Sequence, residues 1–189
     1  MRWPAFAALA LSLIAAPVAA ADSSREAWTA LVNGGHVALV RHGDAPPGYG
    51  GDPPGFKIDD CATQRNLGDR GRGQARALGE AFRQHGVRVD KILSSPWCRC
   101  LETARLMALG PVDNTWVVAA SEKSPERLAA MKQMVSAWRG PGTLVVVTHA
   151  LTVQSLVGIM PDQAETVVLR PKPGSEPGVD VVGRIPARE

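Results

Sequence analysis

The sequence is poor in several residue types that mark common classes of protein. It has 189 residues, with three cysteines, four histidines and one tyrosine, and its aromatic residues amount to 5%. So few cysteines, with scattered histidines, do not form the four-ligand spacing of a zinc site, and no metal site is predicted. The net charge of +3 is small. No lysine and arginine block interleaved with aromatics is present, which argues against a nucleic-acid partner.

Long apolar runs are confined to the N-terminus, so no later segment predicts stable membrane insertion. There, Arg2 precedes an apolar run from Trp3 to Ala16, and small residues follow. The run is shorter than the roughly 20 residues that a spanning helix needs, and the small residues suit a cleavage site. Residues 1–21 are therefore predicted to be a signal peptide, with a retained N-terminal anchor as the alternative. Residues 22–189 are expected to form a single domain that is periplasmic or secreted.

An exported chain enters an oxidising compartment, where its cysteines can pair. Cys61 lies far along the chain from Cys98 and Cys100, which are separated by one residue. We predict one disulfide that uses Cys61, with one cysteine left over. The sequence does not choose between Cys98 and Cys100 as the partner.

Apolar runs alternate with helical patterns along the rest of the chain. Buried strands are expected at residues 37–40, 91–94, 116–119, 143–147 and 165–169. Helices are expected at residues 23–31, 69–84, 96–109, around 124–138, and from the fourth strand to about 159. Such alternation predicts a three-layer α/β domain, with a mostly parallel central sheet and helices on both faces. The Pro- and Gly-rich tail, residues 171–189, is expected to be partly irregular.

Charged residues stand at the ends of three of these strands. Arg41 and His42 follow the first strand, Arg99 lies one helical turn beyond the second, and His149 follows the fourth. Because ligands bind at the carboxyl ends of parallel strands, these side chains are expected to converge. Guanidinium groups match phosphate oxygens and keep their charge, and a neutral histidine can be a nucleophile. The pattern predicts a phosphoryl-transfer site without a metal or cofactor.

These residues resemble the motifs of the histidine phosphatase superfamily, whose small-domain branch also contains the phosphoglycerate mutases. The resemblance covers residues 37–159 and rests on four motifs in the expected order: RHG at 41–43, NLGDRGRGQA at 66–75, SSPWCRCLETA at 94–104 and TH at 148–149. A single RHG tripeptide would say little, whereas four ordered motifs are specific.

The resemblance implies a role for each matched residue. His42 would be the nucleophile that accepts the phosphoryl group, and Arg41, Arg99 and His149 would hold its oxygens. Gly43 would let the chain turn tightly beside the ligand. The implied activity is hydrolysis of phosphomonoesters through a phosphohistidine intermediate, with no cofactor.

Four further residues are candidates that the family motifs do not assign. Arg65 is a candidate third phosphate contact, with a solvated loop arginine as the alternative. Many family members use a glutamate to protonate the leaving group, and the candidates here are Asp44, Glu122 and Glu126. Because Glu126 also suits the start of a helix, the proton donor stays unassigned.

The expected partner is a small phosphorylated substrate, with phosphate or a similar anion in the pocket. Cell-envelope phosphates, such as those of a lipopolysaccharide core, suit an exported enzyme. One alternative is a phosphate-binding protein that has the same pocket but little turnover. Another is a phosphohistidine phosphatase, because Arg-His-Gly-Asp-Ala at 41–45 resembles that branch and a phosphoramidate leaves without a strong proton donor.

Overall fold

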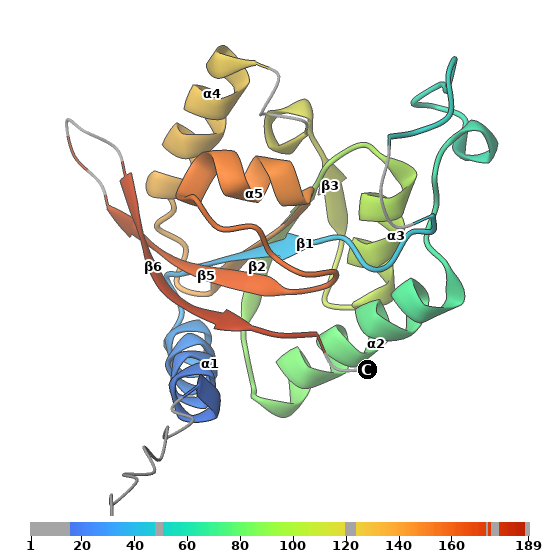
Figure 1. Ribbon diagram of the computed structural model, residues 1–189. Helices are drawn as coiled ribbons and strands as arrows, with labels where there is room; N and C mark the ends of the chain where they lie inside the picture. The colour runs from blue at the N-terminus through green and yellow to red at the C-terminus, as the bar shows by residue number, and fades with distance from the viewer. Residues whose placement is uncertain (1–15, 48–50, 120–123, 173, 175–177, 188–189) are drawn as a thin grey trace, which may run out of the picture.

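A computed structural model describes residues 16–47, 51–119, 124–172, 174 and 178–187. Within this part of the chain, helices cover a mixed sheet on both faces (Figure 1). The strands are β1 (Val37–Arg41), β2 (Val89–Ser94), β3 (Val112–Asn114), β4 (Thr143–Thr148), β5 (Thr166–Lys172) and β6 (Gly178–Ile185), in the order β3-β2-β4-β1-β5-β6. The helices are α1 (Ala16–Asn33), α2 (Asp69–Gln84), α3 (Cys98–Leu106), α4 (Pro125–Ser136) and α5 (Ala150–Val157), with 3-10 turns η1 (Cys61–Thr63) and η2 (Trp116–Val118).

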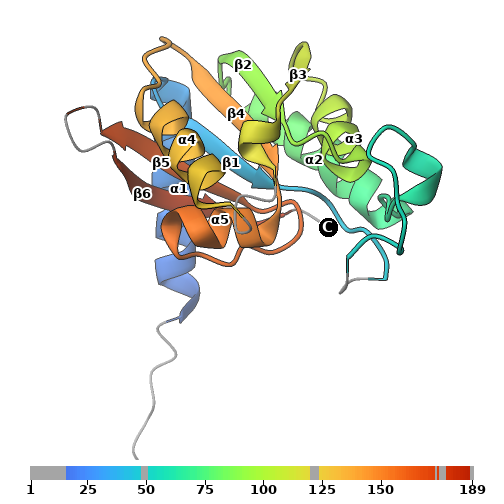
Figure 2. The same cartoon turned by 90° about the horizontal axis from the view of Figure 1, so that it is seen from above.

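The central strand β1 is apolar on both faces because each face carries a helical layer. Ala38 and Val40 pack in a core with α1, α2 and α3, whereas Val37 and Leu39 pack in a second core with α4 and α5. Seen from above, α4 and α5 lie over one face of the sheet (Figure 2). A strand buried on both sides reads as an unbroken apolar run, which is the pattern of residues 37–40. The expected three-layer α/β architecture is confirmed.

The strand expected at 116–119 is wrong. The third strand is instead β3, which pairs in parallel with β2 at Ile92 and Val112. Residues 116–118 form η2 because Thr115 caps the turn, its Oγ1 accepting a hydrogen bond from the Val117 N–H (3.2 Å). The turn buries Val118 and leaves Trp116 50% exposed.

The tail from residue 171 is more regular than expected, because residues 178–185 form β6. β6 runs antiparallel to β5, and β5 runs antiparallel to β1, so the sheet is parallel only on its other side. The carboxylate of Glu165 links β6 to the residues that precede β5. It is 5% exposed and accepts hydrogen bonds from Nε and Nη2 of Arg184. A buried carboxylate needs such a partner, and β6 supplies it.

Helix α1 begins inside the predicted signal peptide and continues past its expected end at residue 21. Among residues 21–33, the part of α1 whose side chains are described, the buried ones are Ala27, Trp28, Ala30 and Leu31. These core contacts lie after that boundary, and cleavage stays a prediction. In the part of the chain that the structure describes, no helix has the length and hydropathy to span a bilayer.

Two glycines of α2 make a matched pair for testing the contact between α2 and α3. A Cβ at Gly79 would lie 1.9 Å from the carbonyl oxygen of Met107, whereas a Cβ at Gly73 would meet nothing within 4 Å. We expect Gly79→Ala to lower the free energy of unfolding by about 1–3 kcal/mol, because the helices must separate. Gly73→Ala should raise it by up to about 1 kcal/mol, because alanine favours a helix. Urea unfolding of both variants tests this, and equal stabilities would contradict the close approach.

Candidate active site

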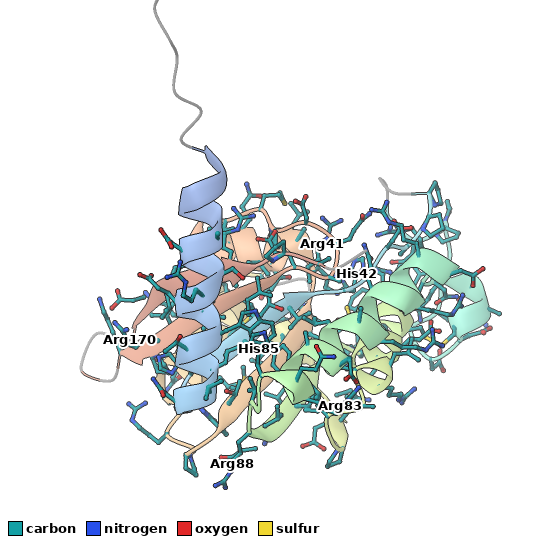
Figure 3. The ribbon with its side chains drawn as sticks, turned by 90° about the horizontal axis from the view of Figure 1, so that it is seen from below. Arg41, His42, Arg83, His85, Arg88 and Arg170 are labelled. Carbon is teal, nitrogen blue, oxygen red and sulfur yellow. A yellow bond between two sulfur atoms is a disulfide. The ribbon has the colours of Figure 1, made fainter. Side chains whose placement is uncertain are left out.

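The carboxyl ends of β1, β4 and β2 lie side by side because these strands are parallel neighbours. Arg41, the last residue of β1, pairs with Thr148, the last residue of β4. His42 and His149 come next, and the His42 N–H donates to the Thr148 carbonyl (3.0 Å). Figure 3 shows Arg41 and His42 near this end of β1. The imidazole rings of His42 and His149 lie 5.6 Å apart between centroids, at 71°.

His42 is held as an uncharged imidazole. Its side chain is buried, and Nδ1 lies 2.8 Å from the carbonyl oxygen of Gly43, which can only accept a hydrogen bond. Nδ1 therefore carries the proton, and Nε2 carries the lone pair. Burial lowers the pKa of His42 to about 3, and the charges of Arg99 and Arg41 act in the same direction. At neutral pH, Nε2 is consequently an unprotonated nitrogen suited to nucleophilic attack.

Gly43 fixes the chain that orients His42. A Cβ at this position would lie 2.6 Å from the carbonyl oxygen of Gly71 in α2, so only glycine fits there. On its other side, the Gly43 N–H donates to Thr103 Oγ1 of α3 (3.1 Å). The acceptor of the His42 proton is thus anchored between two helices.

Three arginines surround the imidazoles. Arg99 is buried in α3, and Arg65 lies beside it, since burial and the charge of Arg99 both lower the pKa of Arg65. Arg41 donates from Nη1 to the Pro161 carbonyl (2.9 Å). The buried Nε atoms of Arg65 and Arg99 have no hydrogen-bond partner among the residues that are placed. A buried donor without an acceptor costs free energy, so an anion bound here would be stabilised.

Asp52 belongs to this site, although the sequence did not indicate it. Its Oδ1 accepts hydrogen bonds from Arg99 Nη1 (2.7 Å) and the Arg65 N–H (2.9 Å). Its Oδ2 accepts from Trp97 Nε1 (2.9 Å). Burial alone would raise the pKa of Asp52, but the hydrogen bonds from the Arg65 N–H and Arg99 outweigh it and lower that pKa. Asp52 lies in a Pro- and Gly-rich loop, where no periodicity could signal a buried carboxylate.

His149 is also uncharged in this pocket. Its Nε2 lies 2.8 Å from Ser95 Oγ and 3.7 Å from Cys100 Sγ. Burial, the neighbouring His42 and Arg99 lower the pKa of His149 well below its usual value. Ser95 was part of a motif without a role of its own, and the structure shows that it holds the His149 ring.

The loop before α2 is fastened to the start of α3 at two points. Cys61 forms a disulfide with Cys98, which settles the partner that the sequence left open. Cys100 is the free cysteine; it is buried, and burial raises its pKa to about 12. In addition, Gln64 Oε1 accepts a hydrogen bond from the Cys98 N–H (3.0 Å). This N–H at the start of α3 is therefore not available to bind an anion. These links set the position of Arg65 relative to α3.

The candidate proton donors differ in their surroundings. Asp44 follows Gly43, and its Oδ1 accepts from Gln163 Nε2 (2.8 Å). Glu126 is exposed at the start of α4, where its own backbone N–H and Ser124 lower its pKa. A lowered pKa makes a carboxyl a poor proton donor at neutral pH. Glu122 lies outside the described residues.

Among the placed side chains, no three His, Cys, Asp or Glu residues are grouped so that they could hold a metal ion.

Known proteins share both motifs and fold with this chain. The histidine phosphatase superfamily (branch 1) matches residues 37–116. The mitochondrial serine/threonine-protein phosphatase Pgam5 of Drosophila virilis is 32% identical over 72 residues, 38% of this chain and 22% of that protein. The Pgam5 protein of Drosophila grimshawi is 31% identical over the same length. The chain therefore spans about a fifth of the length of the curated relatives it matches.

Solved structures with the same architecture cover more of the chain. The protein histidine phosphatase SixA, complexed with tungstate, has a TM-score of 0.57 and 15% identity, over 80% of this chain and 96% of that one. A mycobacterial glucosyl-3-phosphoglycerate phosphatase, complexed with VO3, has a TM-score of 0.52 and 14% identity, over 77% and 96%. At such identities the likeness shows the fold alone.

The protonation of His42 can be followed by NMR. The pKa of a histidine in an unfolded chain is about 6.5, whereas burial lowers the pKa of His42 in the folded protein to about 3. The pKa is lowered on folding, so stability from this group is lost as the pH falls from about 6.5 toward 3. We expect the ring nitrogens of His42 to keep neutral 15N shifts from about pH 8 to about pH 5. A His42→Gln variant assigns the signal, and a midpoint above about pH 6 would contradict the burial.

The disulfide should support anion binding as well as stability. A bridge between residues 37 positions apart contributes about 3–4 kcal/mol if it is unstrained. Titration of the unfolded, unreduced protein should find one free thiol, that of Cys100. Reduction should then raise the dissociation constant for inorganic phosphate, because the loop that carries Arg65 loses one of its two links to α3.

The matched control for this prediction is the Cys61→Ser, Cys98→Ser double variant. Its phosphate affinity should already be low, and reductant should leave that affinity unchanged. Three free thiols in the unreduced protein, or a phosphate affinity that reduction does not alter, would speak against the role of the bridge.

Proposed function

We propose that this chain, which belongs to the histidine phosphatase superfamily, hydrolyses phosphomonoesters through a phosphohistidine intermediate on His42. The observation that carries the proposal is the uncharged His42 imidazole, whose Nε2 lone pair lies among three arginine side chains. A nucleophile and the positive charge that binds a phosphate are thus combined in one pocket. The curated relatives are named as phosphatases, which supports a phosphatase activity.

In the first step, the arginines hold the phosphoryl oxygens while Nε2 of His42 attacks phosphorus. The N–P bond forms as the P–O bond to the leaving alcohol breaks, and the leaving oxygen takes the electron pair and then a proton from solvent water. The hydrogen bond from Nδ1 to the Gly43 carbonyl stabilises the positive charge that develops on the ring. His149, held by Ser95, contributes a further contact to the transferring group.

In the second step, water attacks phosphorus and the N–P bond breaks. Its electron pair returns to Nε2, the water proton passes to solvent or product, and inorganic phosphate leaves. Arg41, Arg65 and Arg99 provide the charge that stabilises the equatorial oxygens in both steps. We propose that no bound metal takes part, because the guanidinium groups fill the electrostatic role that a cation has in other phosphatases.

The substrate is proposed to be a small phosphorylated molecule outside the cytoplasm. The signal peptide at residues 1–21 would export the domain, and cell-envelope phosphates suit that compartment. The unassigned proton donor favours two other candidates. A phosphohistidine phosphatase does not need a strong donor, and SixA is named as a protein histidine phosphatase. A phosphate-binding protein would keep the pocket with little turnover.

An activated aryl phosphate separates an enzyme from a binding protein, because its leaving group needs little protonation. We expect hydrolysis of p-nitrophenyl phosphate that a chelator does not reduce. His42→Ala should lower kcat by about 10³-fold or more and remove the acid-labile phosphoenzyme. Arg99→Ala should weaken phosphate binding and slow transfer.

Arg88→Gln is a suitable control for these variants. The Arg88 side chain is 70% exposed and precedes β2, at the opposite end of the sheet from His42 (Figure 3). The kcat and KM of Arg88→Gln should match those of the unaltered protein.

Activity that disappears in chelator and returns with zinc or magnesium would overturn the metal-free mechanism. Activity of His42→Ala within about tenfold of the parent would mean another nucleophile.

A further inference from the structure

Aromatic side chains gather beside the active site, although aromatics make up only 5% of the sequence. The Trp97 ring lies against His149, with centroids 5.3 Å apart at 84°. Trp116 lies next to Trp97 at 5.6 Å and 76°, and Phe56 lies on Trp97 at 6.1 Å and 39°. The three rings form a continuous surface, here called the aromatic surface, which begins at a histidine of the phosphate pocket.

This surface faces solvent at its outer end. Trp116 is 50% exposed and Phe56 is 36% exposed, while Trp97 is partly buried between them and His149. η2 directs Val118 into the core and leaves Trp116 outside, where the guanidinium of Arg127 lies 5.7 Å from the centroid of its ring. Contiguous exposed apolar surface marks a binding region more often than isolated apolar residues do.

The aromatic surface and the phosphate pocket are held in one geometry by Asp52. Its Oδ2 accepts from Trp97 Nε1 (2.9 Å), and its Oδ1 accepts from Arg99 Nη1 (2.7 Å). The same carboxylate therefore orients an aromatic ring and a guanidinium group. Trp97 also adjoins Cys98, which the disulfide ties to the loop that carries Asp52. A phosphoryl group that contacts Arg99 would therefore lie beside the aromatic surface.

We propose that the aromatic surface binds the leaving group of the substrate, and that this group carries a ring with a flat apolar face. The inference rests on the proposed function, because it places the phosphoryl group at His42. Flat faces of tryptophan rings pack well on aromatic rings and on the C–H face of a pyranose sugar. Both kinds of leaving group present an apolar ring face, and the test distinguishes an aromatic ring from a pyranose.

The test compares substrates in pairs that have similar alcohol leaving groups. Benzyl phosphate is paired with n-propyl phosphate, and glucose 6-phosphate is paired with glycerol 3-phosphate. Trp116→Ala should lower kcat/KM for a ring-bearing member by about 3- to 10-fold, the range expected for one aromatic contact. The open-chain member should change by less than about twofold. Trp116→Phe should restore most of the preference.

Val181→Ala is the matched control, since Val181 of β6 is another large apolar residue that is 41% exposed. Val181→Ala should leave the ratio of kcat/KM between the ring-bearing and the open-chain member unchanged in both pairs. A loss of preference in the benzyl pair identifies an aromatic ring, and a loss in the glucose pair identifies a pyranose. If Trp116→Ala changes neither ratio, the aromatic surface does not bind the leaving group.

Binding of phosphonates keeps this test separate from turnover. Calorimetry with benzylphosphonate and propylphosphonate measures affinity without hydrolysis. Tighter binding of the benzyl compound, lost in Trp116→Ala and kept in Val181→Ala, supports the surface even if no ester is hydrolysed, and in that case only the proposed function fails. Equal affinity for both compounds, or no binding of either, overturns the inference.

Discussion

The parallel register of β1 against β4 is the constraint on which the site depends. It pairs Arg41 with Thr148, so both strands end at the same level and each is followed by a histidine. A shift of one residue would turn Ala38 and Val40 toward the core that Val37 and Leu39 fill, and would separate the two imidazoles. The register is fixed by burial, because Ala38 and Val40 fill one core while Val37 and Leu39 fill the other. Packing on two sides of the sheet thus determines the chemistry at its edge.

The pocket concentrates positive charge around two imidazoles that stay neutral. Burial and the arginines lower the pKa values of His42 and His149, so the histidines do not add to the repulsion among the guanidinium groups. Asp52 offsets part of that repulsion by binding Arg99. In the proposed reaction, an incoming phosphate dianion would offset the remaining positive charge of the guanidinium groups.

The sequence revealed those parts of the molecule that depend on local pattern. The run at 37–40 and the motif residues His42, Arg99 and His149 follow from periodicity and order along the chain. Asp52 could not be found, because its contacts join a loop to α3 and depend on the folded chain. Trp116 looked like part of a strand, since tryptophan and valine favour sheets, and a cap by the preceding threonine decided otherwise.

The partner of Cys61 was undecidable for a related reason. Residues two apart on a helix point about 200° apart, so only one of Cys98 and Cys100 can face the loop, and the sequence does not say which. Cys98 faces it, and Cys100 points inward. Thiol–disulfide exchange requires a thiolate, and burial raises the pKa of Cys100 to about 12, so this thiol stays protonated at neutral pH. Cys100, two residues from Cys98, is therefore a poor nucleophile toward the disulfide, and its burial protects the Cys61–Cys98 pairing against rearrangement.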